Sequence, residues 1–294
     1  MPETSSRLKH SLIMPDKQMI VGVQRAPRFS PNSMDRDMAI LQGVAQNLSA
    51  DGYAVKLVAE EAFALSCISD AVAVFSMARS EAALADLERV DRPVLNPPSG
   101  LRNSRRSVLT RLFAERGLPM PPTWIVRTDG PLPRTDGPCW LKRSDECAQA
   151  SGDVVYAANR QELAVAMRRF AGRGLAEAVV CEHVAGDLIK FYGVEGTGFF
   201  EYYYPTVEGG FSKFGLERHN GVAHGYSFDV QALTAVAEEA ARLLNLPVYG
   251  GDCIVDARGR FFLIDFNDWP SFSRCRDRAA EAIARRVIQA IENN

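Results

Sequence analysis

The sequence predicts an α/β unit followed by a larger unit that mixes helices with antiparallel strands, so the chain combines the α/β and α+β classes. Two observations predict this division. Up to about residue 100, short Val-rich apolar runs alternate with helical patterns, which is typical of a parallel sheet covered by helices on both faces. Beyond it, the apolar runs no longer alternate regularly with helices. We expect domains at 17–100 and 101–294, preceded by a disordered lead at 1–16.

The first unit opens with an apolar run and a helix that has Leu41, Val44 and Leu48 on one face. Ser80 is of the type that caps a helix N-terminus, so a second helix is expected to follow it. Ligands of open α/β sheets bind beyond the carboxyl ends of strands, which makes the loop at 25–32 a predicted substrate wall. The expected strands are 19–23, 54–58, 71–75 and 92–96.

The second unit begins after a Pro-rich break at 96–100, with a helix that stops at Gly117. Asp229 is the expected cap of a later, long helix. A hairpin formed by 249–256 and 261–267 precedes the last helix. Further strands are expected around 124–126 and at 138–143, 178–183, 187–194 and 199–204, with another helix around 163–170.

Composition excludes several classes of protein. The net charge of −2 lacks the basic signature of a nucleic-acid-binding protein. No apolar run is long enough to span a bilayer, so no membrane partner is expected. The six cysteines form no CxxC pair, and we expect them to be reduced thiols in a cytoplasmic protein.

The hairpin carries acids in an otherwise apolar strand, FLIDFNDWPSF (262–272). If the turn centres on Arg258-Gly259, opposite residues have numbers that sum to 517, so Asp252 faces Asp265. Directly opposite residues have Cβ atoms about 5 Å apart. Asn267 points to the same face, two positions further along.

Two carboxylates this close repel each other, and a cation between them relieves the repulsion. Two carboxylates and an amide oxygen suit Mg²⁺, which completes its shell with water and substrate phosphate. Asp252, Asp265 and Asn267 are therefore the predicted metal ligands. The alternative is a solvent-facing hairpin end, and a one-residue slip of register would separate the two acids.

These residues resemble the C-terminal signature of the ATP-grasp superfamily, in which an acid precedes a hairpin that leads to acid-x-Asn-x-x-Pro. Here the signature reads Asp252, then Asp265 to Pro270. The resemblance extends over about residues 100–294, and the first unit looks like the Rossmann-like pre-ATP-grasp domain. It implies ATP as cofactor with one or two Mg²⁺ ions, or Mn²⁺ in their place, and a small-molecule substrate that can be anionic.

The resemblance also implies residues that contact the nucleotide phosphates. Lys142, at the end of PCWLKR, looks like the first nucleotide lysine, although solvation alone explains a lysine at a strand end. Lys190 in DLIKFYGV looks like the second, and the alternative is a lysine that snorkels out of an apolar strand. The segment 144–153 resembles the small-residue loop that closes over phosphates.

A second group is implied to hold the nucleoside. The segment CEHVAGD resembles the hinge whose backbone binds adenine, here around Glu182, His183 and Val184. Asp187 follows the hinge, near the expected position of the ribose.

The reaction type stays open between three alternatives. A carboxylate–amine or carboxylate–thiol ligase would form an acyl-phosphate, and Arg274, Arg218 and Lys190 are its candidate catalytic cations. A kinase acting on a polyol or inositol-phosphate-like hydroxyl is the runner-up, because the Asp-Asp-Asn set resembles the inositol-trisphosphate kinase branch. For that kinase, arginines of the first unit and its junction would form an anion-binding rim: Arg25, Arg28, Arg102, Arg105 and Arg106. The third alternative is a nucleotide-binding module without turnover, and the resemblance leaves room for a homodimer.

Overall fold

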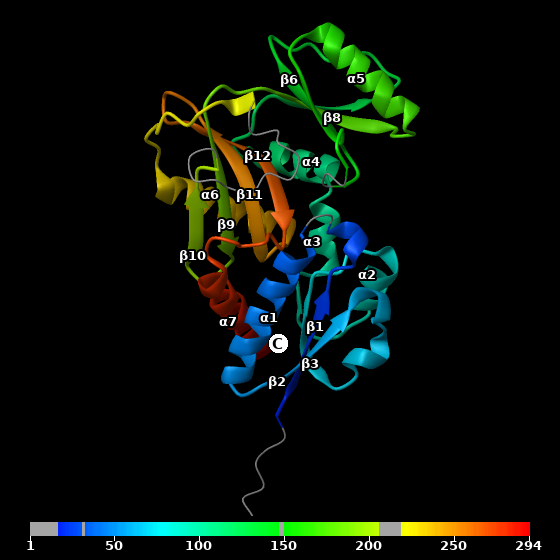
Figure 1. Ribbon diagram of the computed structural model, residues 1–294, viewed down its shortest axis with the longest axis vertical. Coiled ribbons are helices and arrows are strands. Elements are labelled where there is room, and N and C mark those ends of the chain that lie inside the picture. Colours follow the sequence, from blue (N-terminus) through cyan, green and yellow to red (C-terminus); the bar gives the residue numbers. More distant parts are fainter. Residues whose placement is uncertain (1–16, 31–32, 147–149, 206–218) are drawn as a thin grey trace, which may run out of the picture.

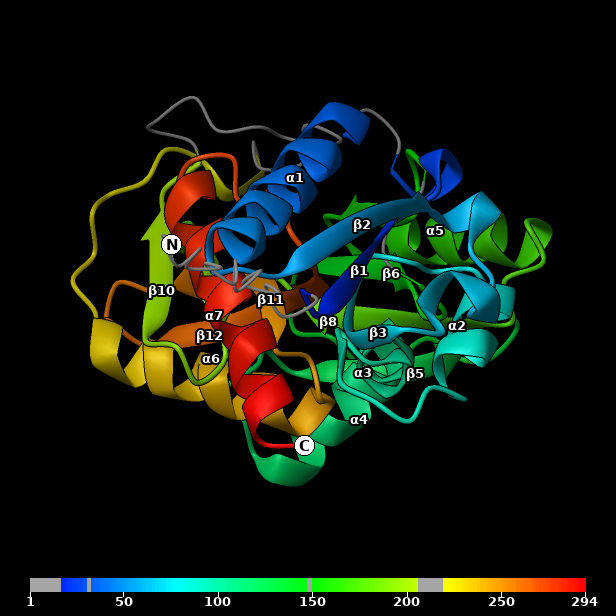
Figure 2. The same ribbon diagram turned by 90° about the horizontal axis from the view of Figure 1, so that it is seen from below.

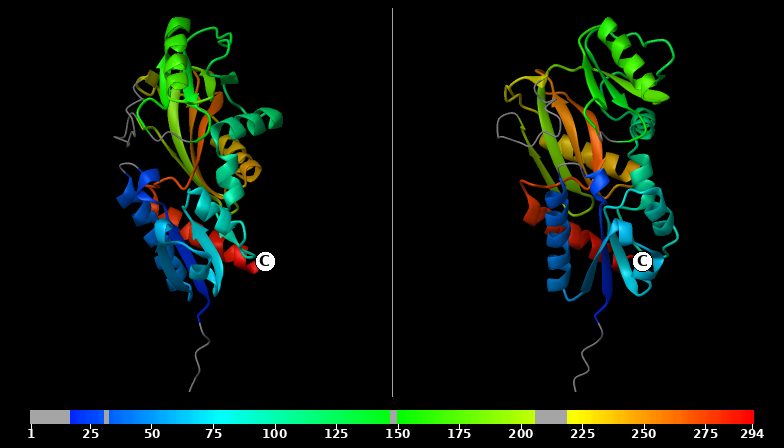
Figure 3. Two further views of the ribbon diagram at one scale, coloured as in Figure 1. Left: turned by 90° about the vertical axis from the view of Figure 1, so that its right-hand side faces the viewer. Right: turned by 45° about the vertical axis from the view of Figure 1, so that its right-hand side comes forward.

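Three four-stranded sheets follow one another along the long axis of the molecule (Figures 1 and 3). The computed structural model describes residues 17–30, 33–146, 150–205 and 219–294. The expected lead at 1–16 lies outside the described residues. The combination of a parallel sheet with antiparallel ones confirms the predicted fold class.

The first sheet is parallel and has the strand order β2-β1-β3-β4. Ser80 caps α2, as predicted, because its hydroxyl accepts from Ala83 N. The elements are β1 (Met19–Gln24), α1 (Met34–Ala50), β2 (Ala54–Ala59), β3 (Ala71–Ser76), α2 (Glu81–Leu87) and β4 (Val94–Leu95).

The segment between the two units is helical, not a break as the prolines suggested. Helix α3 (Pro98–Asn103) begins with Pro98, and proline is tolerated in the first turn because its missing N–H would have no helical partner there. Helix α4 (Arg106–Arg116) then ends at Gly117, whose φ of 72° is the left-handed conformation that glycine accommodates.

The sheet at the end of the molecule opposite the parallel sheet, here called the outer sheet, is antiparallel, has the order β5-β8-β6-β7 and is covered by α5 (Arg160–Gly172). Sequence patterns missed β7, a strand of only four residues. The strands are β5 (Thr123–Arg127), β6 (Cys139–Arg143), β7 (Val154–Ala157) and β8 (Glu177–Glu182).

The central sheet is also antiparallel, with the order β10-β9-β11-β12. Helix α6 (Val230–Leu244) packs on one face, and the Asp229 side chain caps it by accepting from Ala232 N. The strands are β9 (Asp187–Val194), β10 (Phe199–Tyr203), β11 (Val248–Val255) and β12 (Phe261–Asp268).

The central sheet and the first unit share a hydrophobic core. Helix α7 (Arg276–Glu292) lies beside α1 and contacts β3 of the parallel sheet (Figure 2). Trp269, which follows β12, is buried against Phe75 of β3. Asn96 adds a polar link, because its side chain donates to Val248 O and accepts from Val248 N, both at 2.8 Å. The end of β12 is thus anchored in the first unit.

Among the described residues, no helix has the length and apolar character needed to cross a bilayer. The five described cysteines form no disulfide, and four of them are buried, as expected for reduced thiols. The sixth, Cys147, lies outside the described residues.

Candidate metal-nucleotide site

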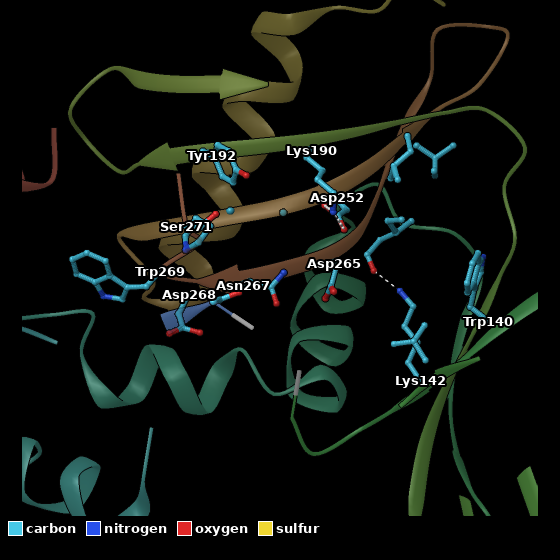
Figure 4. Close-up of a pocket in the computed structure, with 18 of the residues that line it drawn as sticks. Trp140, Lys142, Lys190, Tyr192, Asp252, Asp265, Asn267, Asp268, Trp269 and Ser271 are labelled. Carbon is cyan, nitrogen blue, oxygen red and sulfur yellow. Dashed lines mark hydrogen bonds and ion pairs between the residues drawn. The ribbon is translucent and has the colours of Figure 1, made fainter. Parts of the chain in front are cut away.

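Two carboxylates lie opposite each other on the β11–β12 hairpin. Asp252 pairs with Asp265, so this prediction is confirmed. Asn267 lies two positions further along β12, on the same face. All three side chains line one cavity (Figure 4). The oxygens of the predicted metal set are therefore brought together, whereas their metal-binding role stays a prediction.

The register nearer the turn differs from the expectation. Gly259 has the predicted positive φ of 76°, but Val255 rather than Asp256 faces Phe261. A β-bulge next to Asp252 places one extra residue in β12 and restores the pairing of the acids. The prediction for the turn end was wrong by one residue because a bulge leaves no clear signal in the apolar pattern.

The bulge also places a backbone carbonyl group at the cavity. Its extra residue is Ile264, and the carbonyl oxygen of Ile264 accepts a 2.6 Å hydrogen bond from Lys142 Nζ (Figure 4). Lys142 comes from β6 of the outer sheet, and the whole residue is only 7% exposed. This lysine therefore reaches across the cavity to β12 and does not extend into solvent.

Each carboxylate has a cationic partner. Lys190 Nζ lies 3.1 Å from Asp252 Oδ1, because β9 places Lys190 directly opposite Asp252. Arg106 Nη2 lies 3.2 Å from Asp265 Oδ2. Desolvation raises the pKa of Asp265, but the positive charges of Arg106 and Lys142 outweigh it and hold that pKa below its usual range. Asp265 is consequently ionised at neutral pH.

The sequence predicted Arg106 as part of an anion-binding rim, and the structure corrects this prediction. The residue is 5% exposed, and its guanidinium also donates to the carbonyl oxygens of Arg143 and Glu146. It therefore joins Asp265 to the start of the segment 144–153, part of which lies outside the described residues. Arg102 and Arg105 are also paired, with acids of the first unit and not with the cavity. Arg28 lies over the ring of Phe29.

The cavity has a volume of about 360 Å³ and lies between the outer and the central sheets, with loops of the first unit at one end. This volume is in the range of small-molecule sites. Apolar side chains from both sheets and the segment between them also line the cavity, namely Val154, Val184, Leu188, Ile254 and Ile264.

The predicted hinge residues Glu182, His183 and Val184 all line the cavity. The N–H groups of Glu182 and His183 are bonded to the carbonyls of Pro122 and Pro138. In the part of the chain that the structure describes, the N–H of Val184 makes no hydrogen bond, so it can serve a ligand.

Trp140 is a cavity residue that the sequence reasoning missed. Its Nε1 donates to His183 Nδ1 at 3.1 Å, which fixes the orientation of the imidazole. Burial lowers the pKa of His183, and the nearby His219 lowers it further. Trp140 shares a strand face with Lys142, so strict alternation along PCWLKR could have found it.

The prediction that Asp187 holds a ribose needs correction. Its carboxylate is fully buried and is not part of the cavity lining. One oxygen accepts from His224 N at 2.6 Å and the other from Tyr226 N at 2.9 Å. Burial raises the pKa of Asp187, but these hydrogen bonds lower it further than burial raises it. Asp187 thus fixes the loop that precedes α6.

The predicted catalytic arginines are not both described. Arg274 is exposed, and its guanidinium lies over the ring of Tyr203 at 4.8 Å. Tyr203 lines the cavity and shares a 3.0 Å hydroxyl contact with Tyr192, so Arg274 is at the cavity rim. Arg218 lies outside the described residues.

The end of the cavity opposite the hinge is lined by charged residues of the first unit. Arg25 follows β1 and Arg79 follows β3, and both line the cavity. The role of the loop at 25–32 as a substrate wall stays a prediction. Asp37 and Asp268 lie beside them, so the positive and negative charges at this end balance. The rule that points to loops after parallel strands could have identified Arg79 as it did Arg25.

The donor set fits a hard divalent cation. Among the described residues, no metal site can be built from three or more His, Cys, Asp or Glu side chains. The predicted set differs from such a site, because its third donor is the amide of Asn267. Two carboxylates and an amide suit Mg²⁺, since this ion keeps water and substrate phosphate in its shell. Asp252, Asp265 and Asn267 would hold it, in competition with the two cations that now neutralise the acids.

The solved structures that resemble this chain have the ATP-grasp fold. The D-alanine–D-alanine ligase of Bacillus anthracis gives a TM-score of 0.65 at 10% identity and covers 94% of this chain and 98% of its own. The D-alanyl-alanine synthetase A of Vibrio cholerae gives a TM-score of 0.65 at 13% identity, and the match covers 95% of this chain and 99% of that protein. The RimK domain protein ATP-grasp of Sphaerobacter thermophilus gives a TM-score of 0.64 at 18% identity, and the match covers 92% of this chain and 99% of that protein.

At these identities the likeness shows the fold, and the chain therefore has the ATP-grasp fold over nearly its whole length. No protein-family model matches the sequence. No curated protein matches it either.

Proposed function

We propose that the protein is a Mg-ATP-dependent ligase that joins a carboxylate to an amine or a thiol through an acyl-phosphate. The observation that carries the proposal is the pairing of Asp252 with Asp265, with Asn267 on the same face of one cavity. Lys142 and Lys190 reach that metal set from two different sheets. The similar folds include ligases, and the Bacillus anthracis enzyme has also been solved with ATP.

In the proposed complex, the adenine lies against the hinge and accepts a hydrogen bond from Val184 N–H. The triphosphate extends towards Lys142 and Lys190, which bind its oxygens through charge-assisted hydrogen bonds. Bound Mg²⁺ would neutralise phosphate charge and orient the γ-phosphate. The apolar walls exclude water from the nucleoside.

In the proposed reaction, a substrate carboxylate oxygen attacks the γ-phosphorus, and the bond to the β-phosphate oxygen breaks to release ADP. The amine or thiol then attacks the acyl carbon of the acyl-phosphate. Orthophosphate leaves, and the attacking atom loses its proton. Arg274 is the candidate for stabilising charge at the rim during these steps, because it stacks on Tyr203 of the cavity wall.

The charge balance at the substrate end favours a ligase over a kinase of inositol phosphates. Arg25 and Arg79 are both engaged by Asp268, and Arg25 also pairs with Asp37. A polyphosphorylated substrate would need an excess of positive charge to replace its hydration. The Asp-Asp-Asn metal set remains the argument for a kinase, which is the second candidate.

Phosphorus NMR of the protein with Mg-ATP and pooled metabolites tests the proposal. ADP and free orthophosphate that appear only when carboxylates and amines or thiols are present together would support the ligase. ADP with a new phosphoester resonance would identify a kinase and refute the ligase. If nucleotide binds without any turnover in every pool, the third alternative, a non-catalytic module, gains support.

A further inference from the structure

A buried group of ion pairs joins the first unit to the end of β12. Its members, here called the Asp268 cluster, are Asp268, Arg25, Arg79 and Asp37. Arg25 Nη2 lies 3.2 Å from one carboxylate oxygen of Asp268, and Arg79 Nη2 donates to the other. Arg25 Nη1 lies 3.2 Å from Asp37 Oδ2. The Asp268 side chain is 1% exposed, and the arginine side chains are 9% and 16% exposed.

The cluster is arranged to hold the protein together more than to bind a ligand. Both carboxylate oxygens of Asp268 are already engaged by arginines, and the four charges balance. Buried ion pairs contribute little net stability, but breaking one leaves an uncompensated charge. Their best-supported use is to select one arrangement of the surrounding chain.

The same cluster fixes the backbone that follows Asp268. Arg25 Nη2 also donates to Trp269 O at 3.3 Å. Trp269 has a φ of 36°, a conformation that costs a residue with a side chain about 1 kcal/mol or more. Its indole is 1% exposed and contacts Phe75. Contacts from the first unit therefore help to fix the backbone directly after β12, together with the hydrogen bond from Trp269 N to Val248 O of β11.

One further carboxylate positions both arginines. Glu60 is 5% exposed and accepts from Ala26 N at 2.7 Å and from Arg79 N at 2.9 Å. Ala26 follows Arg25, so Glu60 holds the two arginine-bearing loops at a fixed separation. The cluster is thus supported from behind by backbone hydrogen bonds.

We propose that Asp268 is a positioning residue that sets Asn267 against Asp252 and Asp265 by locking the end of β12 to the first unit. Adjacent side chains of a strand point to opposite faces, so the anchor at Asp268 leaves Asn267 directed towards the metal set. Asp268 lines the substrate end of the cavity, but both of its carboxylate oxygens are engaged by arginines, so it acts on the metal set through the backbone. The inference rests on the proposed function, because the position of Asn267 matters only if metal-nucleotide binds there.

The test compares Asp268→Asn, which removes the charge at nearly constant size, with Asp256→Asn as control. Asp256 pairs with Arg260 at the opposite end of the same hairpin. In the ligand-free protein, amide hydrogen exchange over 266–270 should become faster in the Asp268 variant only. With the non-hydrolysable analogue AMP-PNP bound, electron paramagnetic resonance should report Mn²⁺ affinity reduced about 10-fold, as for other supports of metal ligands. Affinity for metal-free AMP-PNP should stay within about twofold, because the hinge lies in another sheet.

Arg79→Gln is the second variant, chosen because thermal unfolding could show that Asp268→Asn does not fold. It should shift exchange and Mn²⁺ affinity in the same direction, by a smaller factor. Unchanged exchange and Mn²⁺ affinity in the folded variants would overturn the inference, as would an equal loss of metal-free nucleotide affinity. A wild-type protein that binds no Mn²⁺ with AMP-PNP would refute the proposed function, and this inference with it. Wild-type binding beside unchanged variants would refute the inference alone.

Discussion

Replacing Lys190 with Met should strengthen the binding of metal alone and weaken the binding of nucleotide. Lys190 Nζ lies about equally close to both oxygens of Asp252, at 3.1 and 3.2 Å. A cation there competes with a metal ion for the carboxylate but attracts the phosphates of a nucleotide. The two affinities should therefore change in opposite directions.

The magnitude follows from the geometry of the pair. Two unit charges about 4 Å apart attract by about 4 kcal/mol at an effective dielectric constant of 20. The two side chains are 18% and 25% exposed, so solvent screening and desolvation offset most of this attraction. A residual of about 1 kcal/mol corresponds to roughly fivefold tighter metal binding. Loss of a charge-assisted hydrogen bond of about 1.5–3 kcal/mol corresponds to roughly 10- to 100-fold weaker nucleotide binding.

The assay is a pair of titrations on Lys190→Met. Electron paramagnetic resonance measures Mn²⁺ binding without nucleotide, and calorimetry measures AMP-PNP binding without metal. Lys56→Met is the matched control, because Lys56 is exposed on β2 in the first unit. A fall in both affinities, or a change in neither, would refute the reasoning and leave Lys190 as a lysine that snorkels out of an apolar strand.

Three other substitutions test separate parts of the cavity. Arg274→Ala should lower turnover about 10-fold or more while leaving ATP affinity nearly unchanged. If steady-state kinetics show no loss of turnover relative to ATP affinity, Arg274 is a surface arginine without a catalytic role. Trp140→Ala should weaken nucleotide binding roughly 10-fold without altering Mn²⁺ affinity, and equal losses of both would contradict a role confined to the hinge. Asp187→Asn should destabilise the protein by roughly 2 kcal/mol at neutral pH through lost charge-assisted hydrogen bonds to the loop at 224–226. The pKa of Asp187 is lowered in the folded state, so its contribution is present above about pH 4 and is lost as the pH falls below that. Denaturation at several pH values should therefore show a smaller acid-induced loss in the variant than in the wild type.

The pairing of the two hairpin acids was predictable because it depends on a count of residues outward from the turn. Gly259 identified the turn, and counting outward paired Asp252 with Asp265. The observed turn differs from the expected one by one residue, so the predicted pairs nearest the turn were wrong. The bulge at Ile264 compensates for this difference, so the predicted pairing of the two acids was right. A bulge is stabilised by its surroundings, here by Lys142 from another sheet, so the hairpin sequence alone does not reveal it.

Residues whose partners lie far away in the sequence were not predictable in the same way. Arg79 and Asp268 become partners only when the first unit packs on the central sheet, and Arg106 reaches Asp265 only when α4 and β12 meet in the fold. Asp187 is a further example. It follows the predicted hinge in sequence, but its carboxylate is occupied by the backbone of a loop that lies 37 residues further along the chain. Alternation and capping describe neighbours in sequence, whereas these contacts depend on how separately folded elements meet.

Calorimetric titration of wild type and Asp265→Ala with AMP-PNP, with and without Mg²⁺, tests the central claim most directly. The account predicts that Mg²⁺ tightens nucleotide binding to the wild type and that Asp265→Ala loses this enhancement, with the metal-free affinity and the circular dichroism spectrum retained. An enhancement of the same size in both proteins would contradict the claim that the hairpin acids hold the metal-nucleotide.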